Sequence, residues 1–170
     1  MRRSTPKLAL ACALASAVAA ASCIDPVHND AVAALGPEAA GVREGPTHRP
    51  GQPCTVCHGG SGPGSPEFSV AGTVFLTRGA DDPAAGVDVV LIAADGSTRT
   101  ERTNAVGNFY ITRREWDPPF PLRVELQQGG TSKKMETRIG GDGGCGVCHR
   151  SQARGGGDSR HMPGVFLRDK

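Results

Sequence analysis

Short apolar and polar runs alternate along residues 69–139, and clusters of turn residues separate them. In one run Leu122, Val124 and Leu126 alternate with polar residues, which is the period-two pattern of a strand with one face in water. No long stretch carries an apolar stripe with helical period. The runs predict six strands, at 69–77, 87–94, 97–103, 109–113, 122–128 and 133–139. We therefore expect an all-β fold, a small antiparallel β-sandwich of about six to seven strands.

The other segments flank this β-domain, which we place at 67–140. Residues 1–22 have the form of a signal peptide, and residues 23–53 form a tether rich in Pro, Gly and Ala. Two loop-rich segments that contain cysteines lie at 54–66 and 141–170. Their glycine clusters are not nucleotide-binding loops, because neither lies between a strand and a helix.

The strand region resembles the carboxypeptidase-regulatory-like, transthyretin-like β-sandwich family. The resemblance rests on "VAGTVFL", "AAGVDVVLIAADG" and "TNAVGNFYI", the last of which is similar to that family's Thr-Asp-x-x-Gly-x-Phe turn. Asn104 stands where the family usually has Asp, a small departure because either side chain can cap the turn. The resemblance implies a fold, not a chemistry, because such modules serve as spacers, scaffolds and binding units. The polar run 97–103 is a candidate open edge of the sandwich.

The N-terminus predicts export. A basic start is followed by an apolar run from Leu8 to Ala21 and by the small residues of "AAASC", too short and too weakly apolar for a membrane span. Cys23 resembles the acylated cysteine of a bacterial lipobox, although Ala20 stands where that motif usually has Leu. Lipidation of Cys23 would anchor the chain in the outer membrane. Ordinary cleavage nearby would give a soluble periplasmic or secreted protein.

Charge excludes one class of partner. The chain has 19 basic and 17 acidic residues, and three of the basic ones, Arg2, Arg3 and Lys7, lie in the predicted signal. The exported chain is thus slightly acidic and has no run of positive charge for a phosphate backbone. We expect no nucleic-acid partner.

The chemistry lies in two repeats of one motif, Cys54-Thr55-Val56-Cys57-His58 and Cys145-Gly146-Val147-Cys148-His149. The spacing C-x-x-C-H resembles that of c-type cytochromes, in which two thiols add to the haem vinyl groups and the following histidine binds iron. This implies two covalent haems, held by Cys54, Cys57, Cys145 and Cys148 and ligated by His58 and His149. Zinc, bound by four thiolates or by three and a histidine, is an alternative, as is dithiol or disulfide chemistry.

Each iron then needs a sixth ligand or a vacant position. His48 precedes the first motif and His161 follows the second, so we expect these two to complete bis-histidine ligation. Met162 is the rival, because "HMPG" carries a Met-Pro pair like that around the distal ligand of many single-haem cytochromes. Met135 is expected to fill the core, and His28 lies far out on the tether.

These residues favour an exported dihaem c-type cytochrome that transfers single electrons between redox proteins of the cell envelope, an electron carrier in preference to an enzyme. A haem enzyme, peroxidase-like or reductase-like with one open iron, is the second hypothesis, and a non-haem, metal-stabilised binding module is the third. Self-association is a further expectation. An up-and-down path of six strands would return the chain to its starting end and make the two haems neighbours.

Overall fold

The computed structural model describes residues 25–38, 40–150 and 161–169, most of them in or between strands. The predicted signal peptide and Cys23 lie outside the described residues. The helices are α2 (Pro26–Ala34), α3 (Cys54–His58) and α4 (Cys145–Cys148). The strands are β1 (Phe68–Thr77), β2 (Asp88–Ile92), β3 (Thr98–Arg102), β4 (Asn108–Thr112), β5 (Arg123–Gln128), β6 (Thr131–Lys134), β7 (His149–Arg150), β8 (Met162–Pro163) and β9 (Val165–Arg168). No helix in the described part of the chain has the length and apolar character to cross a membrane.

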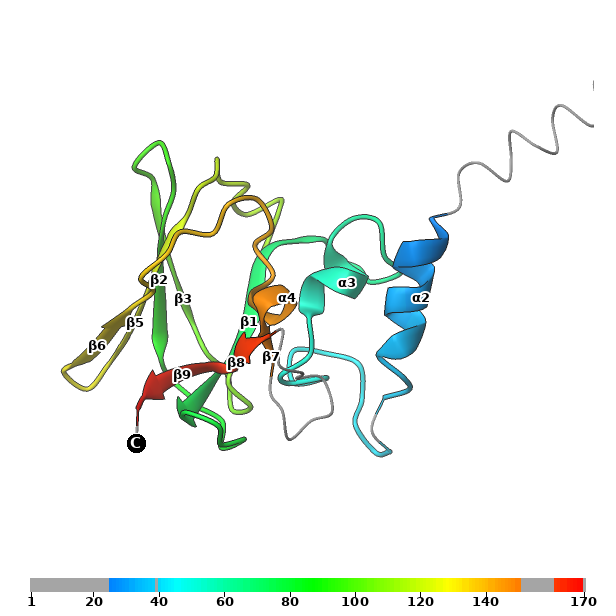
Figure 1. Ribbon diagram of the computed structural model, residues 1–170, viewed down its shortest axis with the longest axis horizontal. Helices are drawn as coiled ribbons and strands as arrows, with labels where there is room; N and C mark the ends of the chain where they lie inside the picture. Colours follow the sequence, from blue (N-terminus) through cyan, green and yellow to red (C-terminus); the bar gives the residue numbers. More distant parts are fainter. Residues whose placement is uncertain (1–24, 39, 151–160, 170) are drawn as a thin grey trace, which may run out of the picture.

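The strands form three small sheets. One sheet has the order β4-β1-β9, a second the order β3-β2-β5-β6, and β7 pairs with β8 (Figure 1). All pairings in the four-stranded sheet are antiparallel, whereas β9 runs parallel to β1. β3 lies at an edge of its sheet, as the polar run 97–103 predicts.

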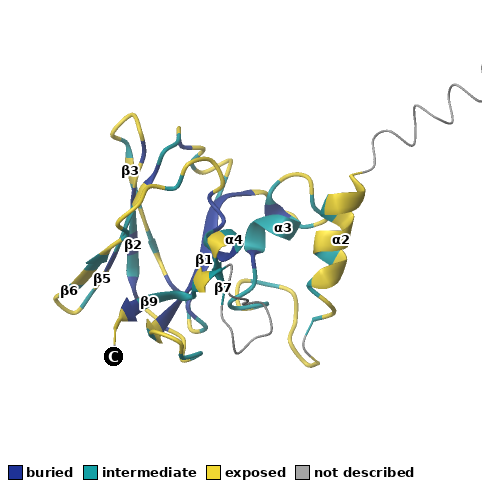
Figure 2. Ribbon diagram, in the orientation of Figure 1, coloured by how far each residue is buried: buried dark blue, intermediate teal, exposed yellow. Residues whose placement is uncertain are grey.

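One hydrophobic core joins the two larger sheets. Val70 and Val74 of β1 and Leu167 of β9 belong to the same buried cluster as Val89 and Leu91 of β2. β1 is buried over most of its length, whereas α2 is largely exposed (Figure 2). Burying side chains of this size stabilises a fold by about 1.5–3 kcal/mol each. β1 is therefore the central structural element of the β-domain.

Trp116 and Phe120 lie in the Pro-rich segment between β4 and β5. Both are partly buried and pack against the core. Such large rings contribute apolar area at the margin of the core even when they are only half-buried.

Five of the six predicted strands are found with shifts of a few residues at their ends, and the sixth is displaced. β6 ends at Lys134, so the expected strand at 133–139 is wrong over most of its length. The two-residue turn Gly129-Gly130, with positive φ at both glycines, pairs Gln128 with Thr131 and starts β6 directly after the turn. Beyond it, Met135 is half-buried outside the core cluster, and Ile139 forms only a single bridge with Leu122.

Six elements of the described chain were not predicted: α2, α3, α4, β7, β8 and β9. Residues 23–53, expected to be an irregular tether, contain α2, which begins at Pro26 after Asp25 accepts a hydrogen bond from the His28 N–H. β9 lies within the segment 141–170 and is the third strand of the sheet β4-β1-β9, where Leu167 is only 1% exposed. Its apolar run, Val165 to Leu167, is too short to show a period.

Candidate functional site

The two C-x-x-C-H motifs form two short helices. α3 spans Cys54–His58 and α4 spans Cys145–Cys148. Within one helical turn, residues three apart lie on the same side, so both thiols of each motif face the same way. All four cysteines are free thiols; three are half-buried and Cys148 is exposed.

Both motifs lie against β1. The backbone N–H of Ala71 donates to the Gly143 carbonyl at 3.1 Å, and Ala71 forms a parallel bridge with Gly144, just before α4. Gly72 leaves room for Cys145, since a side chain there would place a Cβ 2.7 Å from the Cys145 Cβ. Figure 1 shows α3 and α4 beside β1.

The motifs also contact each other. A Cβ on Gly144 would collide with the Thr55 hydroxyl oxygen, and one on Gly146 would lie 2.7 Å from the Pro53 Cα. The two motifs are thus side by side, as expected, but not for the expected reason. The sheet orders are not those of an up-and-down path, because β1 pairs with β4 and not with β2. The chain returns to the first motif along the edge of β1 opposite β4, which Gly144 and β9 cover.

His58 and His149 make the same hydrogen bond. The Nδ1 atom of His58 lies 2.8 Å from the Pro66 carbonyl oxygen, and that of His149 lies 2.8 Å from the Pro163 carbonyl oxygen. A carbonyl can only accept, so each Nδ1 carries the proton and each neutral ring has its lone pair on Nε2. This is the tautomer that a metal-binding histidine needs when it ligates through Nε2.

The first motif borders a cavity of about 760 Å³. Cys54, Cys57 and His58 line it on one side, and His48 lines it as well. Apolar side chains complete much of the lining: Val32, Leu35, Pro63, Phe68 and Phe109. The volume is within the usual range for pockets that hold small molecules and cofactors. The two thiols, a ring with a free Nε2 and an apolar wall together fit a covalently bound haem.

The rings of His48 and His58 lie beside each other at the first motif. Their ring centroids are 5.9 Å apart and their planes differ by 20°. The two rings are stacked, and both line the cavity that Cys54 and Cys57 border. His48 is therefore the second histidine that the described structure brings to the first motif.

The tautomer of His48 differs from that of the other two rings. Its Nδ1 accepts a hydrogen bond from the Gly45 backbone N–H at 3.1 Å, so the neutral ring carries its proton on Nε2. Ligation through Nε2 requires that proton to leave Nε2, with loss of the Gly45 hydrogen bond when Nδ1 takes it up. Distal binding by His48 thus includes a local rearrangement that His58 does not need.

The second motif is arranged differently. Met162 pairs in register with His149 in the β7–β8 ladder and is 45% exposed. Paired residues of neighbouring strands project to the same side, whereas a distal ligand lies across the porphyrin from the proximal one. This pairing does not suit Met162 as the sixth ligand of the iron that His149 would hold. His161, the expected ligand, is half-buried beside Met162.

The cysteines and histidines do not converge on one metal position. Among residues 25–38, 40–150 and 161–169, no group of three or more His, Cys, Asp or Glu side chains is close enough to hold a metal ion. That range includes all four motif cysteines, so the described arrangement offers no ready zinc site.

Burial raises the pKa of two of the four thiols. The pKa of Cys54 rises from 9.0 to about 11, mainly through burial. Burial also raises the pKa of Cys145 to about 12, with the neighbouring Cys54 thiol adding to the effect. A higher pKa lowers the fraction of reactive thiolate at neutral pH.

We expect alkylation of the haem-free protein to follow this order. At pH 8 a thiol of pKa 11 carries roughly a hundredfold less thiolate than one of pKa 9, so iodoacetamide should modify exposed Cys148 well before Cys54 and Cys145. The Cys54 rate should rise roughly tenfold per pH unit until the pH nears 11. Peptide mass spectrometry over time measures both. In denaturant the four rates should converge; equal rates in the folded protein would contradict the burial.

Several residues of the site were missed in the sequence. Phe68 stacks on the His58 ring with centroids 4.3 Å apart, and the carbonyls of Pro66 and Pro163 fix the two motif histidines. Backbone carbonyls and a ring contact leave no pattern in a sequence. A proline eight residues after His58 was the one visible signal.

The chain matches no protein-family model, no curated protein and no solved structure. Its function must therefore be inferred from the geometry of the two motifs and the residues around them.

Proposed function

We propose that the protein is an exported dihaem c-type cytochrome that passes single electrons between redox partners in the bacterial cell envelope. The observation that carries the proposal is common to both motifs: each C-x-x-C-H histidine turns Nδ1 to a proline carbonyl and keeps Nε2 for a metal. Zinc held by three thiolates and a histidine would use this orientation once, and a disulfide would not use it. Covalent haem at both motifs would use it twice.

The side chains have defined tasks in this proposal. Each thiol would add across a vinyl double bond of the haem, its sulfur bonding to one carbon and its proton going to the other. Cys54 and Cys57 would hold the first haem, and Cys145 and Cys148 the second. When bound, the haem iron supplies one-electron exchange between its ferric and ferrous states. His58 and His149 are the proximal ligands in this assignment.

The sixth ligands follow from the same geometry. His48, which lines the same cavity as His58, would be the second protein ligand of the first iron and would then give up the Gly45 hydrogen bond. His161 is our candidate for the second iron, with Met162 as the alternative if β7 and β8 separate. Because the motifs are adjacent, both haems belong to one short path for electrons within the molecule.

The β-domain is proposed to be a sandwich of the carboxypeptidase-regulatory-like, transthyretin-like kind. Two sheets that share one core support this, as does the turn 104–108 between β3 and β4. In this proposal the domain holds the haems at a fixed separation. The open edge of β3 offers a docking surface to a redox partner or to a second copy.

For the location of the protein, we propose acylation of Cys23 and attachment to the outer membrane. The signal-like start and the small residues before Cys23 support it. The competing outcome is a soluble periplasmic protein, and metabolic labelling with a fatty acid in wild type and Cys23→Ser distinguishes the two.

A haem enzyme is the second candidate, favoured by one observation. The pairing of Met162 with His149 disfavours one of the two candidate sixth ligands, so the second iron would be open if His161 did not bind it. A peroxidase-like or reductase-like protein would then show a high-spin ferric signal from one haem. Two low-spin signals would eliminate this candidate.

The decisive experiment is production in a host that attaches haem, followed by intact mass and optical spectra. We expect the added mass of two haems in wild type and of one haem in each of C54S/C57S and C145S/C148S. Magnetic coupling in the paramagnetic resonance spectrum of the oxidised protein should be present only when both haems are. No added mass in wild type would end the cytochrome proposal, and two uncoupled signals would end the neighbouring arrangement.

A further inference from the structure

The loop that carries His48 is hydrogen-bonded to the strands through its carbonyl groups. Asn104 Nδ2 donates to the Pro46 carbonyl at 2.6 Å, and Asn108 Nδ2 donates to the His48 carbonyl at 2.9 Å and to that of Pro46 at 3.3 Å. These contacts join positions about sixty residues apart in the chain. The segment before the first motif is therefore attached to the β-domain at the position of the candidate ligand.

Asn104 uses the two ends of its amide for different tasks. Its Oδ1 accepts hydrogen bonds from the Val106 and Asn108 backbone N–H groups, at 3.0 and 3.1 Å, and closes the turn. Its Nδ2 reaches outward to Pro46. An aspartate could close the turn in the same way but has no N–H to donate, and its charge would face a carbonyl oxygen. The amide is thus needed for the loop and not for the turn.

Asn108 is held by a buried hydrogen-bond network in the sheet β4-β1-β9. Its Oδ1 accepts from the Thr73 hydroxyl at 2.7 Å, and that hydroxyl oxygen accepts from the Gly51 N–H at 2.8 Å. Asn108 is 7% exposed and Thr73 is 6% exposed. Because Thr73 and Asn108 are paired across β1 and β4, the sheet register sets the direction of the Asn108 amide.

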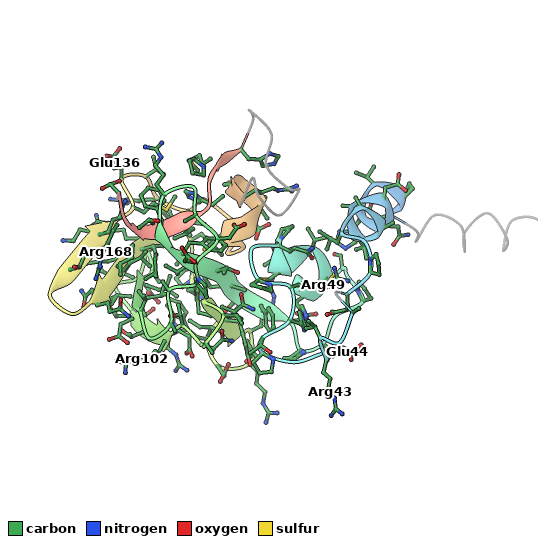
Figure 3. The ribbon with its side chains drawn as sticks, turned by 90° about the horizontal axis from the view of Figure 1, so that it is seen from below. Arg43, Glu44, Arg49, Arg102, Glu136 and Arg168 are labelled. Atoms are coloured by element: carbon green, nitrogen blue, oxygen red, sulfur yellow. The ribbon has the colours of Figure 1, made fainter. Side chains whose placement is uncertain are left out.

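Arg49 holds the other side of the same loop. Its guanidinium binds Glu38 Oε1 at 3.1 Å and the Leu35 and Gly36 carbonyls at 3.3 and 2.8 Å, at the end of α2. Figure 3 labels Arg49 among the segments around the first motif, while Arg43 extends away from them. The loop from Gly45 to Gly51 thus lies between α2 and the sheet, with contacts on both sides.

We propose that Asn104, Asn108 and Thr73 are positioning residues for His48: they fix its backbone so that its ring stays beside that of His58 in the first cavity, at a centroid distance of 5.9 Å. The proposal rests on the proposed function, because it assigns these residues to haem ligation. It also assigns to the β-domain a direct part in the first haem site, through the strands β1 and β4.

The test uses the holoprotein with Asn104→Asp, which keeps the turn and removes only the donor to Pro46. We expect two haems by mass, as in wild type. The variant loses one neutral hydrogen bond and gains a repulsive contact between the new carboxylate and the Pro46 carbonyl. These changes should raise the five-coordinate, high-spin fraction of the first haem about tenfold. The midpoint potential of that haem should shift, while that of the second stays unchanged. The C145S/C148S variant would hold only the first haem, so its spectrum would report that haem alone.

Matched variants separate positioning from general destabilisation. Asn29→Asp makes the same chemical change at an exposed position on α2, and its spectra should be the same as those of wild type. Thr73→Val removes the hydroxyl between Asn108 and Gly51 and should act like Asn104→Asp, whereas Thr73→Ser keeps the hydroxyl and should restore the spectrum.

The outcomes are distinguishable. Wild type without haem overturns the proposed function before any variant is made. Wild type with two haems, together with wild-type spectra and potentials in both Asn104→Asp and Thr73→Val, overturns the positioning role. A change in both haems at once would also overturn it, because it would report loss of the fold and not of one ligand.

Discussion

Replacing Leu167 with alanine is expected to lower the free energy of unfolding by about 2–5 kcal/mol. Leu167 is 1% exposed and brings β9 into the same core as β1 and β2. Removal of its side chain leaves a cavity under an edge strand that has only β1 as a neighbour in its sheet. Denaturant unfolding, followed by far-ultraviolet circular dichroism, measures the loss.

The same substitution should affect the second motif more than the first. β9 follows Pro163, whose carbonyl orients His149, so looser packing of β9 frees that ring. Leu76→Ala is the control, because Leu76 lies on β1 and is 36% exposed. It should cost less than about 1 kcal/mol. Equal losses for Leu76→Ala and Leu167→Ala would contradict the described placement of β9.

Gly143→Ala is expected to destabilise the protein by about 1–3 kcal/mol and to separate the two motifs. A Cβ at this position would collide with the Ser69 carbonyl oxygen on β1, and backbone atoms cannot turn aside as a side chain can. To make room, the chain must give up the hydrogen bond from Ala71 to Gly143.

Gly141→Ala provides the matched control. A Cβ on Gly141 has nothing within 4 Å, so the same substitution two residues earlier should be nearly neutral. We expect faster exchange of the Ala71 amide hydrogen in Gly143→Ala, and weaker magnetic coupling between the haems of the holoprotein. Stability and coupling that match those of Gly141→Ala would show that α4 is not held against β1 in this way.

The sequence predicted the strands that are bounded by turn residues. It did not predict the elements that form only through contacts with distant parts of the chain. β2 and β5 are bounded by turn residues and carry apolar positions on one face, so a local pattern was enough. β9 has three apolar residues after a Met-Pro-Gly segment, and only its pairing with β1 makes it a strand. The apolar and polar alternation at 133–139 gave a wrong prediction, because the turn at Gly129-Gly130 determines where β6 begins.

The candidate site shows the same division. The residues of the C-x-x-C-H motifs were visible at once, because their chemistry depends on spacing within one helical turn. His48 was selected from a small supply of histidines, and the described cavity supports that choice. The tautomers of His48 and His58 could not be foreseen, since they depend on Gly45 and Pro66 atoms that only the folded backbone brings near. Asn104 Oδ1 closes the turn as a carboxylate could, in keeping with the sequence, but the contact of its Nδ2 with the Pro46 carbonyl could not be foreseen.

The edge of β1 opposite β4 has a further consequence during synthesis. Gly143 and Gly144 cover one half of that edge and β9 covers the other, and both are made long after β1 itself. Until they arrive, a long apolar strand presents unpaired backbone groups, which is the state most prone to join another chain. A nascent chain stalled before Leu167 would therefore be exposed to aggregation and proteolysis. Completion of the second motif and protection of β1 would occur in the same step.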